Sequence, residues 1–465
     1  MRYVLVVLLL SNSVQADLNK FAREYLGVAT QVKNLSYAFE AQKISELVEK
    51  EKRDWNLSIS ETITDSELDP GPFSFQAPGQ ETKTTVLSVQ KENLYGGQFN
   101  ISGTLFEFDG SSRNGTPTNL KTYTQEMSYR QDLGSNFLGR LSKLQLSVQE
   151  KTTEYQKEIL NSQKSKELVN FINAYLDFKR DVTLKKLAEE AYKRSQARLN
   201  LVGRQVRDGL KEKVDLLSTK NSHYAQDEAR KNAFQQAFAS KNLFETRLEK
   251  NVSEDEIETY EIKELKLPKY EIKDLENNHD IRSVDKKLDY LNDEIERTRK
   301  AIFPTIQLTA TYETNNVETL DNPVPDGTFG SDNVNKQIGL NVVIPLGFTN
   351  QKNALKAAKV NKMYADYEKK ITKLQVEKKF ATLISQLKIL DQNLKSIVSR
   401  YNLAKSSLAE YNRLYSRGRV SLDQVIRSEE DLINTEKSFV QYKVQREKAY
   451  YSLLDIYGEL TKSFL

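Results

Sequence analysis

The chain of 465 residues contains no cysteine, and this absence removes several classes of protein. Disulfide-stapled domains, thiolate metal centres and cysteine nucleophiles are excluded. We also expect no lipid anchor, because that attachment needs a cysteine directly after a signal peptide. Histidine is scarce as well: His223 and His279 lie far apart and have no metal-ligand partner at a useful spacing. We therefore predict that the chain is not an enzyme and uses no cofactor and no metal.

Residues that break helices are also few, with nine prolines and eighteen glycines. A charged fraction of 29% beside 38% hydrophobic residues is typical of long exposed helices rather than of compact globules. The net charge is only +4, and lysine and arginine alternate with acidic residues. Because no basic stripe is present, nucleic acid is not an expected partner.

Long hydrophobic runs are missing after the first residues. Arg2 precedes a short apolar run over 3–10, and Val14-Gln15-Ala16 offers small residues before Asp17. This pattern predicts a cleaved signal peptide over 1–16, and hence export; an ordinary helical or disordered tail is the alternative. No later stretch reaches the roughly 18 consecutive apolar residues of a membrane helix.

The strongest periodic pattern is a heptad seam between 376 and 411, where apolar residues recur every three or four positions. Its members are Val376, Phe380, Leu383, Leu387, Leu390, Leu394, Ile397, Tyr401, Ala404, Leu408 and Tyr411. The seam ends at Tyr415-Ser416-Arg417-Gly418, and two apolar series then repeat at seven: Val425, Leu432, Phe439 and Ile426, Ile433, Val440. The chain is therefore predicted to form a long antiparallel helical hairpin whose tip is at Gly418.

Period-two alternation predicts strands in two regions, about 54–133 and about 304–346. Four strand faces are apolar: Trp55, Leu57, Ile59, Ile63; Tyr123, Gln125, Met127, Tyr129; Ile306, Leu308, Ala310, Tyr312; and Ile338, Leu340, Val342, Ile344. Two further strand-like runs, 84–90 and 98–108, flank a turn at Gly96-Gly97. The pattern leaves open whether this hairpin joins the other strands or projects outside.

The order strands, outgoing helix, tip and returning helix occurs twice. The tip glycines Gly209 and Gly418 are 209 residues apart, and the Leu-Gly pairs that close the strand regions, at Gly134 and Gly347, are 213 apart. We predict a signal peptide at 1–16, a first repeat at 17–250, an irregular insert at 251–279 and a second repeat at 280–465. The first repeat should begin with a helix over 17–52 and hold a hairpin over about 135–250. The second should begin with a helix over 280–302 and hold a hairpin over about 348–460.

So few strands cannot close a barrel alone, and open edges are not tolerated in lipid. If the apolar face meets lipid, several chains must share one barrel; a soluble antiparallel sheet has the same alternation and is the alternative.

In this order the motifs resemble the TolC-like outer-membrane efflux protein family over essentially the whole exported chain. The resemblance rests on the two tip motifs, on a strand-opening Phe303-Pro304, and on Ile344-Pro345-Leu346-Gly347 followed by Ala354 and Ala357-Ala358. The tip motifs are Arg207-Asp208-Gly209-Leu210 with Val214-Asp215-Leu216-Leu217, and Tyr415-Ser416-Arg417-Gly418-Arg419-Val420-Ser421 with Gln424-Val425-Ile426.

The resemblance implies a mainly α fold with a membrane β-barrel, built as a homotrimer that shares one barrel in the outer membrane of a Gram-negative bacterium. The barrel would continue into an α-helical coiled-coil tunnel in the periplasm. Implied partners are outer-membrane lipid, a periplasmic adaptor (membrane fusion) protein and an inner-membrane pump or ABC exporter. The chain would be a passive exit duct for efflux or type I secretion, and the cargo stays open.

The resemblance also implies roles for residues near the tips. Adaptor docking falls on Arg207, Asp208, Gly209, Leu210, Arg417, Gly418, Arg419 and Val420. Asp215 and Tyr415 match a gating hydrogen bond between a phenol and a carboxylate. Constriction candidates are Asp423, Gln424 and Arg427, although Gln424 and Arg427 stand where acidic residues can line the family's constriction.

A different class of function stays open from the residues alone. An exported coiled-coil structural or adhesion protein with a small β head would show similar helices. It would not explain why strand pairs occur twice, each before a long hairpin.

Overall fold

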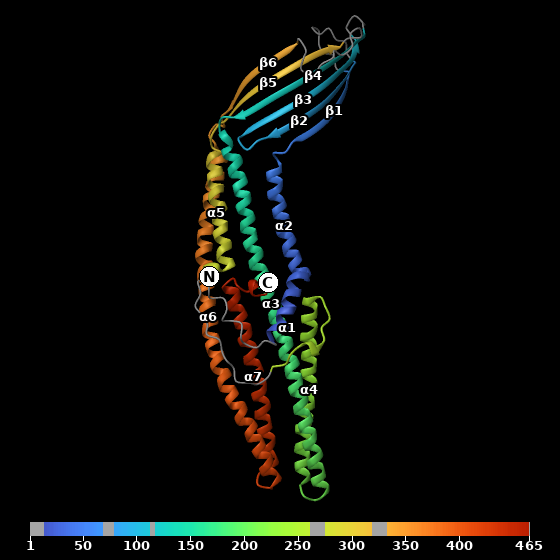
Figure 1. Cartoon of the computed structure of the whole chain (residues 1–465), viewed down its shortest axis with the longest axis vertical. Coiled ribbons are helices and arrows are strands. Elements are labelled where there is room, and N and C mark those ends of the chain that lie inside the picture. Colours follow the sequence, from blue (N-terminus) through green and yellow to red (C-terminus); the bar gives the residue numbers. More distant parts are fainter. Residues whose placement is uncertain (1–13, 68–78, 112–116, 261–274, 319–332, 465) are drawn as a thin grey trace. The chain divides into compact units, whose positions relative to one another are not determined.

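We analysed a computed structural model of the chain, which describes residues 14–67, 79–111, 117–260, 275–318 and 333–464. The described residues form seven α-helices, six strands and four short 3-10 turns (Figure 1). The helices are α1 (Val14–Val28), α2 (Thr30–Glu51), α3 (Arg140–Arg207), α4 (Lys213–Leu248), α5 (His279–Lys300), α6 (Thr349–Ser416) and α7 (Leu422–Ile456). The strands are β1 (Asn56–Ser66), β2 (Gln80–Glu92), β3 (Gly97–Ser111), β4 (Pro117–Asp132), β5 (Thr305–Glu318) and β6 (Val334–Val343).

By contacts the chain divides into two compact units, and each unit draws on both sequence repeats. The helical unit consists of residues up to 39, 157–283 and 369 onward. The sheet unit consists of 40–156 and 284–368. No helix among the described residues is long and apolar enough to cross a membrane.

The helical unit has a core of aromatic rings contributed by α1, α3 and α4. Tyr25 stacks on Phe171 with ring centroids 4.2 Å apart, and Phe244 lies edge-on to Phe21 at 5.5 Å. Phe178 completes the group against Phe244. These rings are almost fully buried, so they supply much of the apolar burial that holds α1 and α4 against α3.

The predicted heptad seam is confirmed. Each of its eleven residues on α6 is buried or packs against one of the apolar clusters of the helical unit. Both seven-residue series on α7 are buried as well. The hairpin of α6 and α7 therefore forms as the periodicity predicts, because burying one stripe per helix offsets the entropy of ordering a long helix.

The helix predicted over 17–52 is instead two helices, α1 and α2, separated at Ala29. The break has a local cause. The Glu249 carboxylate accepts hydrogen bonds from both the backbone N–H and the side-chain hydroxyl of Thr30, each at 2.9 Å. This carboxylate caps the first turn of α2, so a new helix starts where the apolar pattern alone shows none.

The six strands form one antiparallel sheet in the order β1-β2-β3-β4-β5-β6 (Figure 1). The register brings all four predicted apolar faces to the same side. Leu57 pairs with Val89, Met127 with Tyr312, and Leu308 with Leu340. The opposite side carries mostly hydroxyl and amide side chains, such as Ser58, Ser88 and Asn100. Among the described residues the sheet is open, with β1 and β6 at its edges.

The hairpin left open by the sequence belongs to this sheet, because β2 and β3 lie between β1 and β4. The turn between them packs on the segment that starts α3. Gly139 has φ +72°, and a Cβ placed there would lie 1.6 Å from the Leu94 carbonyl oxygen. The Asn136 side-chain oxygen meanwhile accepts from the N–H groups of Leu141 and Ser142 at 3.0 and 3.1 Å.

Aromatic residues gather at this end of the sheet. The Trp55 and Phe99 rings meet edge to face at 6.3 Å, and Lys143 Nζ lies 4.7 Å from the centre of the Tyr95 ring. Trp55, Tyr95, Tyr129, Phe137 and Phe303 all remain substantially exposed. These residues therefore form a group of exposed rings at the end of the sheet that joins the helices.

The two halves match in their helices. Both α3 and α6 contain 68 residues, and α4 and α7 contain 36 and 35. The sequence spacing suggested a difference of about one turn between the outgoing helices. The helices themselves have equal lengths, because residues 134–139 form a loop with a 3-10 turn before α3 begins, whereas α6 begins two residues after Gly347.

Some predictions lie outside the described residues: residues 1–13 of the signal peptide predicted over 1–16, the proline-containing loop predicted after the first strand, and residues 261–274 of the insert. The described ends of the insert are irregular, as predicted, with 3-10 turns at Glu254–Glu256 and Leu275–Asn277.

We predict that Gly139→Ala destabilises the sheet unit by more than about 2 kcal/mol, because the new methyl group meets a backbone oxygen and φ is positive. Thermal unfolding of the purified protein would measure this loss. Gly339→Ala is the matched control, since nothing lies within 4 Å of the added Cβ. An equal effect of the two substitutions would contradict the packing of the turn on α3.

Candidate functional site

The two chain reversals have the same backbone geometry. After α3 the Leu210 N–H donates to the Gln205 carbonyl at 2.8 Å, and Gly209 has φ +71°. After α6 the Arg419 N–H donates to the Leu414 carbonyl at 3.0 Å, and Gly418 also has φ +71°. Each helix thus ends in a glycine-dependent C-terminal cap at the positions that the sequence repeat predicts.

The residues with predicted docking roles are mostly exposed. Arg207, Asp208, Gly209 and Leu210 at one tip, and Arg417, Gly418 and Arg419 at the other, lie on the surface. Leu210 is 72% exposed, which is unusual for a leucine in a short turn. Val420 differs, because it packs against the apolar cluster below the tip that includes Val202, Tyr415 and Val425. Val420 therefore contributes to the packing of the tip.

The predicted hydrogen bond between Tyr415 and Asp215 is absent. The Tyr415 hydroxyl is buried and has no hydrogen-bond partner among the described residues. Burial raises the pKa of this phenol, and the nearby Asp215 carboxylate raises it further. Lys211 Nζ lies 4.7 Å from the ring centre. The two residues are near enough to interact through charge, although the hydroxyl makes no hydrogen bond.

The three constriction candidates are engaged in local contacts at the start of α7. The Arg427 guanidinium pairs with the Asp423 carboxylate at 2.8 Å on an exposed face. The Gln424 side chain accepts from the Ser421 N–H at 3.0 Å, and the Ser421 hydroxyl accepts from the Gln424 N–H, so the two form a capping box. This turn of α7 therefore presents a neutral ion pair and a cap rather than a free acidic ring.

Two arginines of α3 and one carboxylate of α7 form a buried cluster that sequence reasoning missed. Arg194 Nε donates to Glu429 at 2.9 Å, and Arg198 donates to the other oxygen of the same carboxylate. The Glu429 side chain is only 5% exposed. Burial lowers the pKa of Arg198, and the neighbouring Arg194 lowers it further. This cluster ties the first helical hairpin to the second.

A signal for this cluster exists in the sequence. Glu429 and Glu436 each stand three residues after a buried isoleucine of α7, Ile426 and Ile433, so both occupy a seam position. Two arginines spaced by four on α3 offer the matching charge. Glu436 is also buried, and burial raises the pKa of its carboxyl, partly opposed by Arg194.

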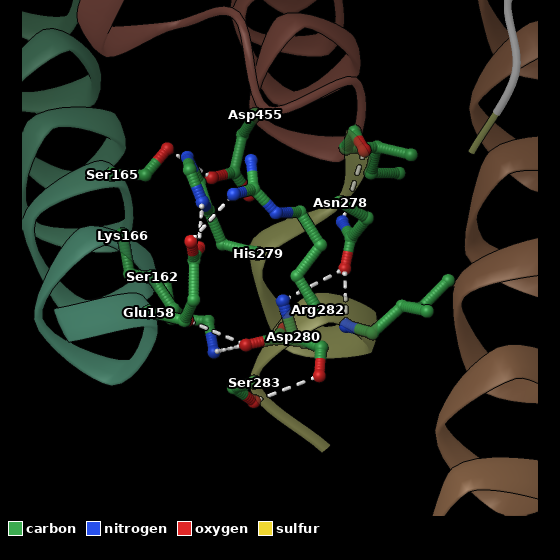
Figure 2. A network of polar contacts seen from close by, with 12 residues as sticks. Glu158, Ser162, Ser165, Lys166, Asn278, His279, Asp280, Arg282, Ser283 and Asp455 are labelled. Carbon is green, nitrogen blue, oxygen red and sulfur yellow. Dashed lines mark hydrogen bonds and ion pairs between the residues drawn. The ribbon is translucent and has the colours of Figure 1, made fainter. Parts of the chain in front are cut away.

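A second polar cluster joins α3, the start of α5 and the end of α7 (Figure 2). The Glu158 carboxylate receives Arg282 at 2.6 Å and His279 Nδ1 at 3.1 Å. The Asp280 carboxylate accepts from Lys166 at 2.8 Å. Asn278 donates to the Ile456 carbonyl at 2.9 Å while its own oxygen caps α5. Figure 2 shows these side chains directed at one another, so the cluster fixes where α5 starts.

Neither cluster has the composition of a metal or catalytic centre. Within the part of the chain that the structure describes, no group of three or more histidine, aspartate and glutamate side chains could hold a metal ion. His223 contacts the Ser195 hydroxyl at 3.0 Å and lies against the Tyr192 ring at 5.0 Å. Both histidines are therefore held by structural contacts.

Residues 273–459 match the model of the outer membrane efflux protein family. The resemblance to TolC-like outer membrane efflux proteins is confirmed. The matched segment contains α5, both strands of the second repeat and the hairpin with its tip at Gly418. The family's description agrees with the expectations of an outer-membrane location and of no enzyme activity. No curated protein matches the chain.

Solved outer-membrane channels have the same fold over nearly the whole chain. VceC of Vibrio cholerae aligns with a TM-score of 0.70 at 14% identity, covering 95% of this chain and 96% of VceC. CmeC of Campylobacter jejuni gives 0.69 at 12% identity, covering 96% and 86%. The open state of MtrE of Neisseria gonorrhoeae gives 0.65 at 14% identity, covering 95% and 89%. At these identities the likeness establishes the fold alone.

We predict that Glu429→Gln lowers stability by about 3 kcal/mol, because it leaves the partly buried Arg194 and Arg198 guanidinium groups without their anion. Hydrogen exchange should show lost protection in α7 around 425–440, together with a lower unfolding temperature. Glu430→Gln, on the exposed neighbour, is the control and should change little. Unchanged protection in the Glu429 variant would argue against the tie between the hairpins.

The raised pKa of Glu436 predicts a pH-dependent effect. The native state favours the protonated carboxyl, so its stabilising contribution is present below the usual pKa near 4.5 and is lost as pH rises. Glu436→Gln should therefore raise the unfolding temperature at pH 7.5. The gain should shrink towards zero below about pH 4, where both side chains are neutral. A gain that stays constant across pH would show that charge is not the cause.

Proposed function

We propose that this chain is a passive outer-membrane exit duct of a tripartite efflux or type I secretion system in a Gram-negative bacterium. Three copies share one barrel in the outer membrane, and their helices form a periplasmic tunnel. The tips dock a periplasmic adaptor, which is coupled to an inner-membrane pump or ABC exporter. The duct has no energy source of its own, so the partner drives transport.

The observation that carries this proposal is the two-sided open sheet. One face gathers Leu57, Val89, Met127, Leu308 and Leu340, while the other is lined by hydroxyl and amide groups. A sheet with an apolar outside and a polar inside is the wall of a membrane barrel. Its edges, β1 and β6, must find partners in lipid, and further copies of the same sheet provide them.

The helices that continue from these edges also have unused apolar stripes. On α6, Val360, Tyr364, Tyr367, Ile371 and Leu374 are all more than half exposed and are spaced four, three, four and three residues apart. On α2, which leads into β1, Tyr37, Ile44 and Val48 are at least half exposed and are seven and four residues apart. Exposed heptad stripes beside both free strand edges support a side-to-side contact between copies.

Docking and gating are proposed for the tips. Arg207 to Leu210 and Arg417 to Arg419 form two exposed turns of matched geometry, which suits a repeated partner surface. Opening requires the two hairpins of a protomer to move relative to each other. The buried contact of Arg194 and Arg198 with Glu429 opposes that motion. We therefore assign the closed-state tie to this contact, in place of a hydrogen bond between Asp215 and Tyr415.

The shared barrel predicts crosslinks between copies. Because the chain has no cysteine, any disulfide must come from an introduced pair. The pairs combine Ser58→Cys or Ser60→Cys on β1 with Gln337→Cys or Asn341→Cys on β6. Oxidation in outer membranes should give covalent dimers and trimers on denaturing gels. The single-cysteine variants are the controls. A fully soluble monomer without crosslinks would sink the duct and favour a coiled-coil structural or adhesion protein.

The tip role predicts a separable defect. Gly418→Pro removes the N–H that donates to the Tyr415 carbonyl at 3.0 Å and cannot adopt φ +71°. We expect heat-modifiable trimers to form normally while export falls at least tenfold and crosslinking to the adaptor is lost. Gly203→Ala is the control, because its Cβ meets only Leu216 Cδ1 at 3.9 Å. Normal export by the proline variant would refute docking at this turn.

A further inference from the structure

The two repeats contribute unequally to the sheet. The second repeat supplies β5 and β6, whereas the first supplies four strands, β1 to β4. The surplus is one hairpin, β2 and β3, with its turn at residues 93–97. Since the outgoing helices α3 and α6 match in length, the β2–β3 hairpin is the main departure from two-fold repetition within the sheet.

The hairpin is built as part of the wall rather than as an attachment to it. β2 pairs with β1 over the whole length of β1, from Asn56 opposite Gln90 to Ser66 opposite Gln80. β3 pairs with β4 from Gly97 opposite Gln131 to Ser111 opposite Pro117. With 13 and 15 residues, both strands exceed the roughly 9–11 residues that cross a bilayer.

Over residues 87–90 and 101–105 its side chains follow the two-sided chemistry of the neighbouring strands, whereas Phe106 and Phe108, farther from the turn, lie on the polar face. Leu87, Val89, Ile101 and Leu105 lie on the apolar face of the sheet, in register with Ile59 and Leu57 of β1 or with strand β4. Ser88, Gln90, Ser102 and Thr104 lie on the polar face. A flap outside the membrane would have no need for an apolar face that continues that of β1 and β4.

The turn between β2 and β3 lies at the end of the sheet that carries the exposed aromatic rings, and hydrogen bonds hold it there. Gln131 donates to the Tyr95 carbonyl at 2.8 Å, and Asn93 accepts from the N–H of Gly97 at 2.9 Å. Tyr95 and Phe99 belong to the same group of aromatic rings as Trp55 and Tyr129. The hairpin therefore spans the same layer as the other strands.

Strand parity explains why the surplus is a pair. In an antiparallel sheet of six strands, β1 and β6 run in opposite directions. The edge of one copy can then continue the alternation on the edge of the next. One added strand would place parallel edges together and would start α3 at the wrong end of the sheet. A hairpin avoids both faults.

We propose that β2 and β3 are a barrel-widening insertion, so that three copies close an eighteen-stranded barrel whose polar lumen admits bulky hydrophilic cargo. The inference rests on the proposed trimeric duct. Barrel diameter grows roughly linearly with strand number, so the lumen is about 1.5-fold wider than one built from two strands per repeat. Barrels of about this strand number hold an open aqueous channel.

Single-cysteine labelling tests where the hairpin lies. In outer membranes, Leu87→Cys and Ile101→Cys should react with a lipid-soluble maleimide, and Ser88→Cys and Ser102→Cys with a water-soluble one. Ile59→Cys and Ser58→Cys on β1 are the matched controls and should divide in the same way. If both hairpin faces react with the aqueous reagent while the β1 pair divides, the hairpin lies outside the wall and the insertion is refuted. If the β1 pair also reacts with the aqueous reagent, the proposed duct itself fails.

Deletion tests the width. Removing Gln80–Ser111 joins β1 to β4 through the remaining loop residues and leaves an even number of strands. Trimers of this variant, reconstituted in planar bilayers, should exclude neutral polymers of hydrodynamic radius about one third smaller than those excluded by the full chain. Polymer is added from the barrel side, so the tips do not limit the measurement. An unchanged cut-off overturns the proposal. If the variant does not assemble, the cut-off of the full chain decides, because a radius matching a twelve-stranded lumen contradicts it.

Discussion

Unpaired strand edges are the constraint on which the rest of this structure depends. Each backbone N–H and C=O at the outer edge of β1 and β6 must find a partner, and lipid offers none. In the proposed trimer the sheet closes with other copies, and the helices that continue from its edges then also meet their counterparts. The exposed stripes on α2 and α6 follow from the same requirement. A single chain is an incomplete structure in this sense, with its apolar faces arranged for neighbours.

Within the chain, the helical unit is held by apolar seams that a few polar contacts orient. The aromatic core around Phe171 and Phe244 buries apolar surface but does not by itself select one alignment of the helices. The alignment of the helices is fixed by charged groups that can pair in only one arrangement. Glu429 lies between two arginines, and Glu158 lies between Arg282 and His279. Buried ion pairs of this kind add little net stability, but they penalise every other register heavily. In the proposed duct, that property suits helices that hold one alignment at rest and release it when cargo passes.

Sequence periodicity predicted much of the fold because long helices and two-faced strands repeat their burial at fixed intervals. The eleven seam residues on α6 and the four apolar strand faces are examples. The contacts near the tip were harder. Glu429 interrupts an apolar pattern, although its spacing of three residues from Ile426 places it in the seam. Gln424 is predicted to line a constriction, and in the structure it also completes a capping box with Ser421, three residues earlier. Whether the Tyr415 hydroxyl finds a hydrogen-bond partner depends on its rotamer and burial, which a sequence pattern does not contain.

The equal lengths of α3 and α6 constrain how such a chain can change during evolution. In the proposed barrel, the sheet can gain a whole hairpin because the two added strands leave the ends of the neighbouring strands in place. The helices have no such freedom, because a heptad added to one repeat alone would leave its turn out of line with the other. Length changes in the tunnel must therefore arise in both repeats together and in steps that preserve the seam. Strand number in the sheet can therefore change more easily than the length of the helical hairpins.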